Sequence, residues 1–229
     1  MTTVALIGAD GAGKTTVAAR LDGALPVPVR YMYMGVSAES SNVLLPTTRL
    51  ARRIKRATGA PPDTAGPPSH GPRKPRSRSF AKRRVADARS FLRLTNRLAE
   101  EWYRQWLAWR WERGGAVVVF DRHFYVDYHA YDVAATDRSW AQRMHGVILE
   151  RFYPRPDLVV YLDAPGEVLL RRKGEGTVEA LERRRDEYRA IAPHVPAFVE
   201  VDASQPLETV TGQVVEAIVD RLPADRRHP

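Results

Sequence analysis

Short apolar runs recur along the chain, and none of them alternates cleanly between apolar and polar positions. Such continuous runs are typical of strands whose sheet is covered by helices on both faces. Five of them are rich in valine, isoleucine and tyrosine, and they lie at residues 4–8, 29–34, 116–121, 158–163 and 197–202. We predict that these runs form the buried parallel strands of one sheet.

Helical patterns occupy the stretches between the predicted strands. The longest covers about residues 79–113 and ends at Gly114 and Gly115, because glycine readily takes the backbone conformation that stops a helix. The others are expected at 14–25, 138–152, 166–173, 177–191 and 207–222. Strands that alternate with helices predict an α/β fold: a doubly wound, five-stranded parallel sheet with helices on both faces.

One proline- and glycine-rich stretch departs from this pattern. Residues 59–78 read GAPPDTAGPPSHGPRKPRSR and show no periodicity, which indicates a mobile surface loop inserted into the fold. It is either an inert insertion or a lid over an acidic substrate. We expect a single domain over residues 1–222, followed by a frayed tail at 223–229.

The positive charge of the chain is concentrated in one region. The formal net charge is +9, and residues 49–93 hold 14 Lys and Arg against two acids, a local excess of +12. A concentrated basic surface favours an anionic partner, which can be a phosphorylated small molecule, a nucleic acid or a lipid head group. The absence of cysteine excludes disulfides and thiolate metal sites.

The sequence predicts neither a secretion signal nor a membrane span. The first eight residues lack a basic segment followed by a long apolar run. No apolar stretch approaches the roughly 20 residues that a membrane helix needs. We expect a cytoplasmic protein.

The strongest motif follows the first predicted strand. Residues 8–15 read GADGAGKT and match the pattern G-x-x-x-x-G-K-[ST], in which glycines let backbone N–H groups surround the phosphates of a nucleotide. Lys14 would place its charge on the β and γ phosphates of ATP, and the Thr15 hydroxyl would coordinate Mg²⁺. The alternative is a structural glycine-rich turn. The predicted ATP-binding residues are Gly8, Asp10, Gly11, Ala12, Gly13, Lys14, Thr15 and Thr16.

A second candidate anchor ends the third predicted strand, where Asp121, Arg122 and His123 follow four apolar residues. Asp121 can bind Mg²⁺ together with Thr15 or accept a proton from the nucleophile, and Arg122 can hold a phosphate through two hydrogen bonds. The alternative for this pair is a salt bridge at the end of a strand. His123 is either a substrate contact or a structural histidine.

Arginines are dense in residues 171–189, which read RRKGEGTVEALERRRDEYR and lie within a predicted lid at 165–192. Small kinases close an arginine-bearing lid over the phosphoryl group, which excludes water and neutralises developing charge. Arg171 and Arg172 are the candidate catalytic residues, although the pattern leaves open which arginine reaches the phosphate. The alternative is a solvated helix whose arginines pair with glutamates one turn away.

These motifs, in this order, resemble those of the thymidylate kinase group within the nucleoside monophosphate kinase fold. The resemblance rests on GADGAGKTT after the first strand, DRH after the third, and YLDAP at the end of the fourth, followed by the arginine-rich region. It implies a five-stranded parallel sheet, a homodimer, and transfer of the γ-phosphoryl group of ATP to thymidine monophosphate with Mg²⁺.

The resemblance also implies roles for individual residues. Asp10 takes the place of an acid that touches the sugar hydroxyl of the acceptor, and Arg122 that of the arginine that holds the acceptor phosphate. Gly11 stands where some members have a basic residue, and members without it carry the working arginine in the lid. Arg97 resembles a helix arginine near the thymine base.

The departures from this family fall on the acceptor side. The family has an Arg-Glu-Pro-Gly-like loop after the second strand, whereas residues 34–39 read MGVSAE. Val126 replaces a serine that often follows the Asp-Arg pair, and Asp132 replaces the glutamine of an Ala-Tyr-Gln sequence. The basic residues within 73–84 are candidates to replace the missing loop arginine, so we expect the region between the second and third strands to set specificity.

The sequence therefore predicts a kinase of a small acceptor, with a nucleoside monophosphate similar to thymidine monophosphate as the first candidate. Another nucleotide, a sugar or a specialised metabolite is the alternative acceptor. Two other classes stay open. One is a nucleotide-dependent protein that binds nucleic acid through residues 49–93, against which no groove-reading motif is present. The other is a protein whose basic helix at 47–57 rests on an anionic membrane.

Overall fold

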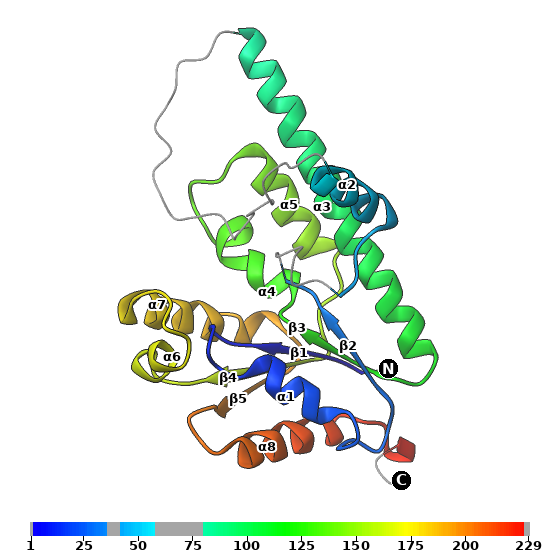
Figure 1. Cartoon of the computed structure of the whole chain (residues 1–229), viewed down its shortest axis with the longest axis vertical. Coiled ribbons are helices and arrows are strands. Elements are labelled where there is room, and N and C mark those ends of the chain that lie inside the picture. Colours follow the sequence, from blue (N-terminus) through cyan, green and yellow to red (C-terminus); the bar gives the residue numbers. More distant parts are fainter. Residues whose placement is uncertain (1, 36–41, 58–79, 227–229) are drawn as a thin grey trace.

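Parallel strands form a five-stranded sheet at the centre of the protein (Figure 1). The computed structural model describes residues 2–35, 42–57 and 80–226. The strands are β1 (Thr3–Ile7), β2 (Val29–Tyr33), β3 (Val117–Asp121), β4 (Leu158–Asp163) and β5 (Phe198–Asp202), in the spatial order β2-β3-β1-β4-β5. All neighbouring pairs are parallel, which confirms the predicted five-stranded parallel sheet.

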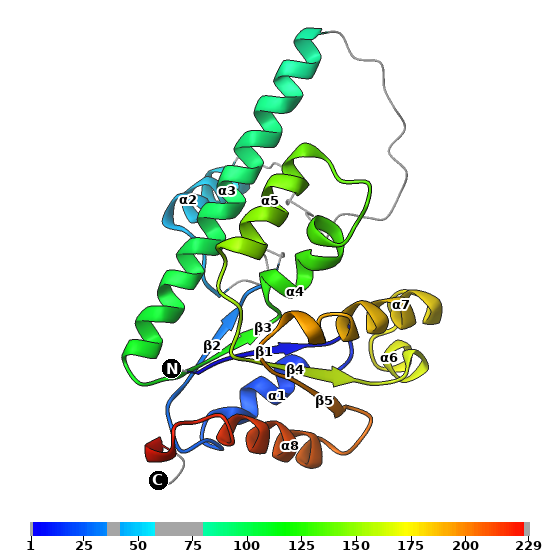
Figure 2. The same cartoon turned by 180° about the vertical axis from the view of Figure 1, so that it is seen from behind.

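Helices cover both faces of this sheet, as its continuously apolar strands require. On one face lie α1 (Lys14–Leu21) and α8 (Leu207–Val219) (Figures 1 and 2). On the other face lie α3 (Phe80–Arg113), α4 (Phe124–Tyr128) and α5 (Trp140–Arg151). The remaining helices are α2 (Pro46–Ala57), α6 (Gly166–Lys173), α7 (Val178–Arg189), the π-helix η1 (His129–Val133) and the 3-10 helices η2 (Ala192–His194) and η3 (Ala224–Arg226).

Two apolar cores hold these layers together. On the face covered by α1 and α8, Val17 and Val214 pack with the inward side chains of β1 and β4. On the opposite face, Tyr125 and Leu149 pack with Tyr161. Because side chains of β1 pack into both cores, the loop that follows this strand is anchored to a rigid part of the protein.

The strand register brings the carboxyl ends of three strands to one place. Leu6 of β1 pairs with Asp121 of β3, and Tyr33 of β2 pairs with that same residue. The chain leaves β1 between β3 and β4, where the order of the sheet reverses. Ligands of open α/β sheets bind in the crevice that forms at such a switch point, outside the carboxyl ends of the strands.

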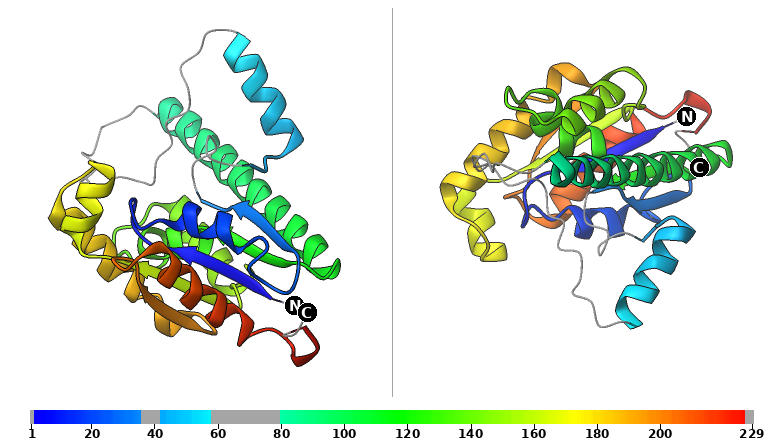
Figure 3. Two further views of the ribbon diagram at one scale, coloured as in Figure 1. Left: turned by 60° about the horizontal axis from the view of Figure 1, so that its bottom comes forward. Right: turned by 90° about the horizontal axis from the view of Figure 1, so that it is seen from above.

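The long helix α3 matches the prediction for residues 79–113, and its N-terminal half projects beyond the sheet (Figures 1 and 3). It ends before Gly115, whose φ of 87° is the left-handed conformation that the glycine stop requires. Figure 3 shows α2 at the periphery, away from the sheet. No helix in the described ranges is long and apolar enough to cross a membrane.

Several segments differ from the sequence prediction. α1 ends at Leu21 and not near residue 25, because Asp22 is extended and Gly23 has a φ of 86°. α4 and η1 were not predicted, because their aromatic sequence lacks helical periodicity.

At the chain terminus, part of the tail that we expected to fray forms η3, and Arg226 donates a hydrogen bond to the carbonyl oxygen of Gly115 (3.2 Å). The proline-rich insertion at 59–78 lies outside the described residues. The same holds for the side chains of the basic cluster at 73–84.

Candidate active site

The loop between β1 and α1 has the backbone geometry of an anion-binding nest. Gly8 and Gly11 have φ angles of 148° and 94°, which favour glycine. A Cβ atom at Gly8 would lie 2.5 Å from the carbonyl oxygen of Leu162, and one at Gly11 would lie 2.9 Å from that of Leu169. The loop is therefore packed tightly between the end of β4 and α6, and only glycine fits at both positions.

Lys14 lies at the centre of this loop. Its Nζ donates hydrogen bonds to the carbonyl oxygens of Gly8 (2.8 Å) and Ala9 (3.0 Å), and the side chain is buried. Burial, with a smaller contribution from the positive charge of Arg122, lowers the pKa of Lys14 to about 8. The ammonium group is held over the nest, where phosphate oxygens can replace the two carbonyls.

The predicted magnesium ligands are neighbours. The Thr15 hydroxyl donates to Oδ2 of Asp121 (2.9 Å), and the Tyr31 hydroxyl donates to the same oxygen (2.8 Å). A hydroxyl and a carboxylate are the hard oxygen ligands that Mg²⁺ prefers, so these residues fit that ion. Within the described ranges no three His, Asp or Glu side chains form a metal cage. Mg²⁺ would therefore need phosphate oxygens and water to complete its coordination.

Arg122 reaches from the end of β3 towards the phosphate loop. Its NH2 group lies 2.5 Å from Oδ1 of Asp10, so the structure brings together two residues that the resemblance assigns to the acceptor. Burial alone would lower the pKa of Arg122, but the negative charge of Asp127 and smaller contributions from Tyr188 and Asp10 raise it. Arg122 has a φ of 65°, a strained conformation of the kind that clusters at functional sites.

Asp127 is a candidate site residue that sequence reasoning missed. Its carboxyl group is buried on α4, and burial raises its pKa, opposed by the positive charges of Arg122, Arg184 and Lys14. An acid inside the otherwise apolar and aromatic stretch FYVDY, just after the Asp-Arg pair, was the available signal. Such an acid is buried with a partner, because an isolated buried charge is too costly.

Among the lid arginines, Arg184 faces this cluster. Its NH2 lies 3.5 Å from Oδ1 of Asp127, and its NH1 lies 3.5 Å from the hydroxyl of Tyr131. The guanidinium also stacks over the ring of Tyr188, with 4.7 Å from Cζ to the ring centroid, and pairs with Glu187 (2.7 Å). Arg184 is therefore the arginine of the predicted lid that the structure places beside Asp127.

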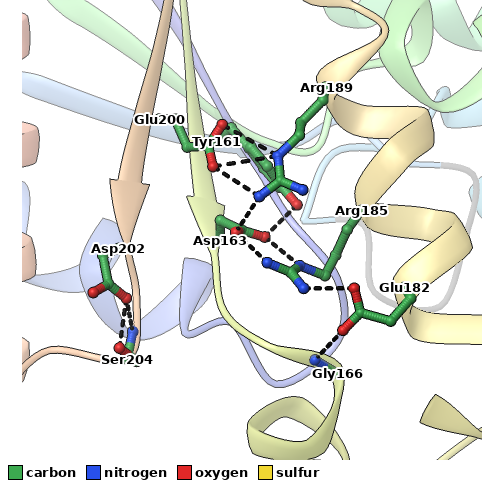
Figure 4. Close-up of polar contacts among 9 residues, drawn as sticks. All are labelled: Tyr161, Asp163, Gly166, Glu182, Arg185, Arg189, Glu200, Asp202 and Ser204. Carbon is green, nitrogen blue, oxygen red and sulfur yellow. Dashed lines mark hydrogen bonds and ion pairs between the residues drawn. The ribbon is translucent and has the colours of Figure 1, made fainter. Parts of the chain in front are cut away.

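Two other arginines of α7 bind the sheet instead (Figure 4). Arg185 contacts both carboxylate oxygens of Asp163 at the end of β4, at 2.7 and 2.6 Å, and Arg189 adds a third contact at 2.7 Å. Burial would raise the pKa of Asp163, but hydrogen bonds from Arg185 and Tyr161 and the charges of both arginines lower it. These arginines fasten α7 to the sheet.

The two lid residues predicted to be catalytic lie on α6 and are exposed. NH1 of Arg172 donates to the carbonyl oxygen of Ala203 (2.8 Å). The Cβ of Arg172 would lie 3.5 Å from a Cβ atom built at Gly11, so the base of this side chain lies against the phosphate loop. Arg171 is exposed at the end of the same helix, and no contact to the loop is described for it.

The structure places the two remaining candidate substrate residues differently. The His123 ring is buried against Phe120 and Tyr153, and its Nδ1 accepts a hydrogen bond from the backbone N–H of Tyr125 (3.2 Å). Burial lowers the pKa of His123 to about 3, so the ring is neutral. This arrangement favours the structural interpretation over a substrate contact.

Arg97 is half-exposed on α3. Its NH1 lies 3.3 Å from Oδ2 of Asp132, and its guanidinium lies over the ring of Tyr128 at 4.6 Å from the centroid. Further along α3, sequence reasoning missed Arg104, which is buried and donates to the carbonyl oxygen of Gly35 (3.2 Å). A Cβ atom at Gly35 would lie 2.7 Å from Cδ of Arg122, so this contact brings the end of β2 against the site.

A cavity of about 590 Å³ opens on another side of Thr15, between α1 and β2. It is lined by Tyr31, Asn42 and Trp111 among others, but not by Arg122, Asp127 or Arg184. It is therefore distinct from the polar cluster at the carboxyl ends of β1 and β3.

The fold and this site together define the class of protein. A glycine-rich loop joins the central strand β1 to the helix α1. Asp121, at the end of β3, accepts a hydrogen bond from the hydroxyl of Thr15, and the sheet has the order β2-β3-β1-β4-β5. This is the P-loop kinase fold, with its ligand crevice at the switch point of the sheet.

Comparisons with known proteins narrow this class. No protein-family model matches the chain. A probable thymidylate kinase of Thermococcus gammatolerans is 31% identical over 116 residues, which are 47% of this chain and 53% of that protein. A probable thymidylate kinase 1 of Saccharolobus solfataricus is 25% identical over 112 residues, which are 46% of this chain and 56% of the other. The chain thus spans about half the length of the curated relatives it matches.

A solved structure shares the fold over nearly the whole chain. The deoxyadenosine kinase of M. mycoides, with bound dATP, is similar with a TM-score of 0.50 at 14% identity, over 94% of this chain and 98% of that one. The chain is therefore distantly homologous to thymidylate kinases over about half of its length, and it shares the P-loop kinase fold.

Proposed function

We propose that this protein transfers the γ-phosphoryl group of ATP to a nucleoside monophosphate, with thymidine monophosphate as the first candidate acceptor. The observation that carries the proposal is the meeting of two sets of residues at one edge of the sheet. Lys14, Thr15 and Asp121 form the nucleotide side. On the other side Arg122 contacts Asp10, and Arg184 contacts Asp127, whose buried charge also acts on Arg122. Two facing anion-binding groups are what a phosphoryl transfer between two nucleotides needs.

On the nucleotide side, the N–H groups of the loop would bind the β and γ phosphates, and Lys14 would exchange its two carbonyl contacts for phosphate oxygens. Thr15 and Asp121 would hold Mg²⁺, which neutralises phosphate charge when bound. Tyr31 donates to the Asp121 oxygen that also accepts from Thr15. Its hydroxyl thereby keeps the carboxylate oriented towards the loop.

On the acceptor side, Asp10 would contact the acceptor sugar and Arg122 the acceptor phosphate, as the resemblance implies. Arg184 would reach the transferring phosphoryl group from the lid. Both guanidiniums are already held by acids, Arg122 by Asp10 and Arg184 by Asp127. Because their positions are set in advance, less side-chain freedom has to be lost when the acceptor binds.

An acceptor screen tests this proposal. Purified protein is incubated with ATP and Mg²⁺ plus single nucleoside monophosphates, nucleosides or sugars, and ADP release is measured beside the Lys14→Ala variant. We expect the highest kcat/KM with a nucleoside monophosphate, and a loss on the order of 100-fold or more in Lys14→Ala, which removes the charge facing the γ-phosphate. Turnover of nucleosides alone would move the acceptor to that class, and full activity of a folded Lys14→Ala protein would overturn the kinase assignment.

A second test separates the two sides of the site. Asp121→Asn should lower kcat, because it weakens a partner of the magnesium ion in the transition state. Arg122→Ala should mainly raise the KM of a phosphorylated acceptor while the KM for ATP changes little. Unchanged acceptor kinetics in both variants would show that this strand-end pair is only structural.

A further inference from the structure

A buried histidine outside the proposed site lies between two buried acids. His145 is on α5, Glu101 on α3 and Asp132 on η1, and all three side chains have no exposed surface. Nδ1 of His145 lies 2.7 Å from Oδ2 of Asp132. Nε2 lies 3.0 and 3.1 Å from the two carboxylate oxygens of Glu101.

This geometry indicates that the His145 ring is a doubly protonated imidazolium. Ionised carboxylates only accept hydrogen bonds, so a ring nitrogen that faces one must carry a proton, and both nitrogens of His145 face one. Burial alone would lower the pKa of His145, but the hydrogen bonds to Asp132 and Glu101 outweigh it and raise the pKa. Arg97 supplies the second positive charge through its contact with Asp132 (3.3 Å), so the four groups together are neutral.

Other groups around the ring do not supply a competing proton. The ring of Tyr128 on α4 packs edge-on against His145 at 4.8 Å between centroids, and burial raises the pKa of its phenol. Arg138 donates to the backbone carbonyl of Asp132 (2.8 Å) and not to its carboxylate. The other carboxylate oxygen of Asp132, Oδ1, is buried without a hydrogen-bond partner in the described part of the chain. The described partners of the Asp132 carboxylate are therefore His145 and Arg97.

The histidine fixes an unusual piece of backbone. Asp132 belongs to the π-helix η1, which is closed by a hydrogen bond from the N–H of Ala134 to the carbonyl oxygen of His129 (2.8 Å). π-Helices are rare and are frequently found at functional sites. A Cβ atom at Gly146 would overlap the carbonyl oxygen of Asp132, so α5 and η1 are in direct backbone contact beside the histidine.

The same backbone carries the partners of the lid arginine. Tyr131, next to Asp132, contacts NH1 of Arg184, and Asp127, on the helix that leads into η1, contacts its NH2. A shift of η1 would thus move both groups that hold Arg184. This matters for catalysis because misplacement of a catalytic group by about 1 Å can cost on the order of 100-fold in rate.

We propose that His145 is a positioning residue, whose imidazolium ties η1 to α3 and α5 and thereby sets the place where Arg184 of the lid is received. His145 acts through Asp132 and the segment 127–132, and does not touch the reacting groups. The kinetic part of this inference rests on the proposed phosphotransferase function. The protonation and the anchoring of η1 do not.

The protonation is tested without any assay of activity. In a ¹⁵N-labelled protein, the His145 ring should show the imidazolium pattern at pH 8, where an ordinary histidine is neutral. Hydrogen exchange should be faster in segment 127–134 of His145→Gln than in the wild-type protein. A neutral His145 ring at pH 6 to 8, or unchanged exchange in that segment, would overturn the inference even if no acceptor were turned over.

The coupling to the lid is tested by a double-mutant cycle on the turnover of the acceptor found in the screen. His145→Gln should lower kcat on the order of 10- to 100-fold in the wild-type background, with little change in the KM for ATP. On the Arg184→Ala background, the same substitution should lower kcat by less than about threefold, because both changes remove one function. Arg20→Ala, at an exposed pair with Glu208, is the matched control and should leave the His145→Gln effect unchanged.

If the fall in kcat of the double variant equals the product of the falls caused by His145→Gln and Arg184→Ala alone, the two residues act independently and the coupling is refuted. If His145→Gln fails to fold, the charge-balanced variant His145→Gln with Glu101→Gln replaces it, because it leaves one buried carboxylate, paired with Arg97. That variant should fold and show the same non-multiplicative behaviour with Arg184→Ala. Wild-type kcat in this charge-balanced protein would also refute the positioning role.

Discussion

At the scale of single residues, the phosphate loop shows a conflict between function and stability. The ammonium group of Lys14 is buried against carbonyl oxygens of its own loop, and its pKa is about 8 where a free lysine has 10.5. Between these two values the folded protein binds fewer protons at Lys14 than the unfolded chain does. The free energy of unfolding therefore rises with pH through this window.

We predict that Lys14→Met makes the protein without nucleotide more stable at pH 7 while it abolishes phosphoryl transfer. The gain should be on the order of 1–3 kcal/mol at pH 7 and should shrink between pH 8 and 10, as wild-type Lys14 loses its proton. Urea unfolding of both proteins at several pH values measures it. A Met variant that is less stable than wild type at pH 7 would contradict this account.

Arg122 illustrates a second conflict, because it combines a φ of 65° with a side chain that the site needs. Alanine at this position keeps the strain and loses the guanidinium, whereas glycine loses both. We predict that Arg122→Gly and Arg122→Ala have equally poor acceptor kinetics, but that the glycine variant is more stable by about 1 kcal/mol. Thermal unfolding of the two variants measures this difference in stability. Equal stability would show that the backbone at residue 122 is not strained.

At the scale of elements, α7 divides its arginines between two tasks. Successive residues of a helix point about 100° apart, so the neighbours Arg184 and Arg185 face different surroundings. Arg184 lies in the cluster with Asp127, and Arg185 lies on Asp163 at the end of β4. The helix is thus fastened to the sheet through Arg185 and Arg189 (Figure 4), while Arg184 faces Asp127.

We predict that alanine at these two neighbours has opposite consequences. Arg184→Ala should lower kcat on the order of 100-fold with little loss of stability, because Arg122 and Lys14 still act on the buried charge of Asp127. Arg185→Ala should lower the free energy of unfolding by about 1–3 kcal/mol, because it leaves Asp163 with fewer partners. Each variant is the control for the other, and identical profiles would refute the division.

At the scale of the whole molecule, α5 presents an apolar face to solvent. Trp140, Met144, Val147 and Phe152 are all exposed, at 50%, 42%, 44% and 66%, and the first three lie on one side of the helix. Contiguous exposed apolar surface commonly marks an interface. We propose that this face is the interface of the homodimer that the family resemblance implies. We also propose that residues 1–222 form a single domain in each subunit.

We predict that Met144→Glu with Val147→Glu converts a dimer into a folded monomer, because charges cannot be buried unpaired in an interface. Light scattering after size exclusion measures the mass. The matched control is Leu50→Glu with Ile54→Glu on α2, which changes two similarly exposed residues away from this face and should leave the dimer intact. A dimer that survives the α5 change, or dissociates with the α2 change, would place the interface elsewhere.

The sequence by itself determined the sheet and the loop. The five strands could be predicted from the sequence because helices cover both faces of the sheet, so each strand is continuously apolar. The phosphate loop at residues 8–15 could be predicted because a nest of backbone N–H groups requires glycine at fixed spacing. Asp121 could be placed beside Thr15 for a similar reason, because parallel strands end at the same edge and an acid at the end of one lies near a loop that follows another.

Only the tertiary structure decided which side chains complete the site. Nothing local separates Arg184 from Arg183 or Arg185, because all three belong to one run of arginines and the docking of α7 decides which of them faces the cluster. Asp127 left a signal in the sequence, but its partners, like the roles of Arg104 and His145, were decided only by the packing of the helices. Buried charges find their partners across elements that lie far apart in the chain, and that pairing is set by packing and not by spacing along the sequence.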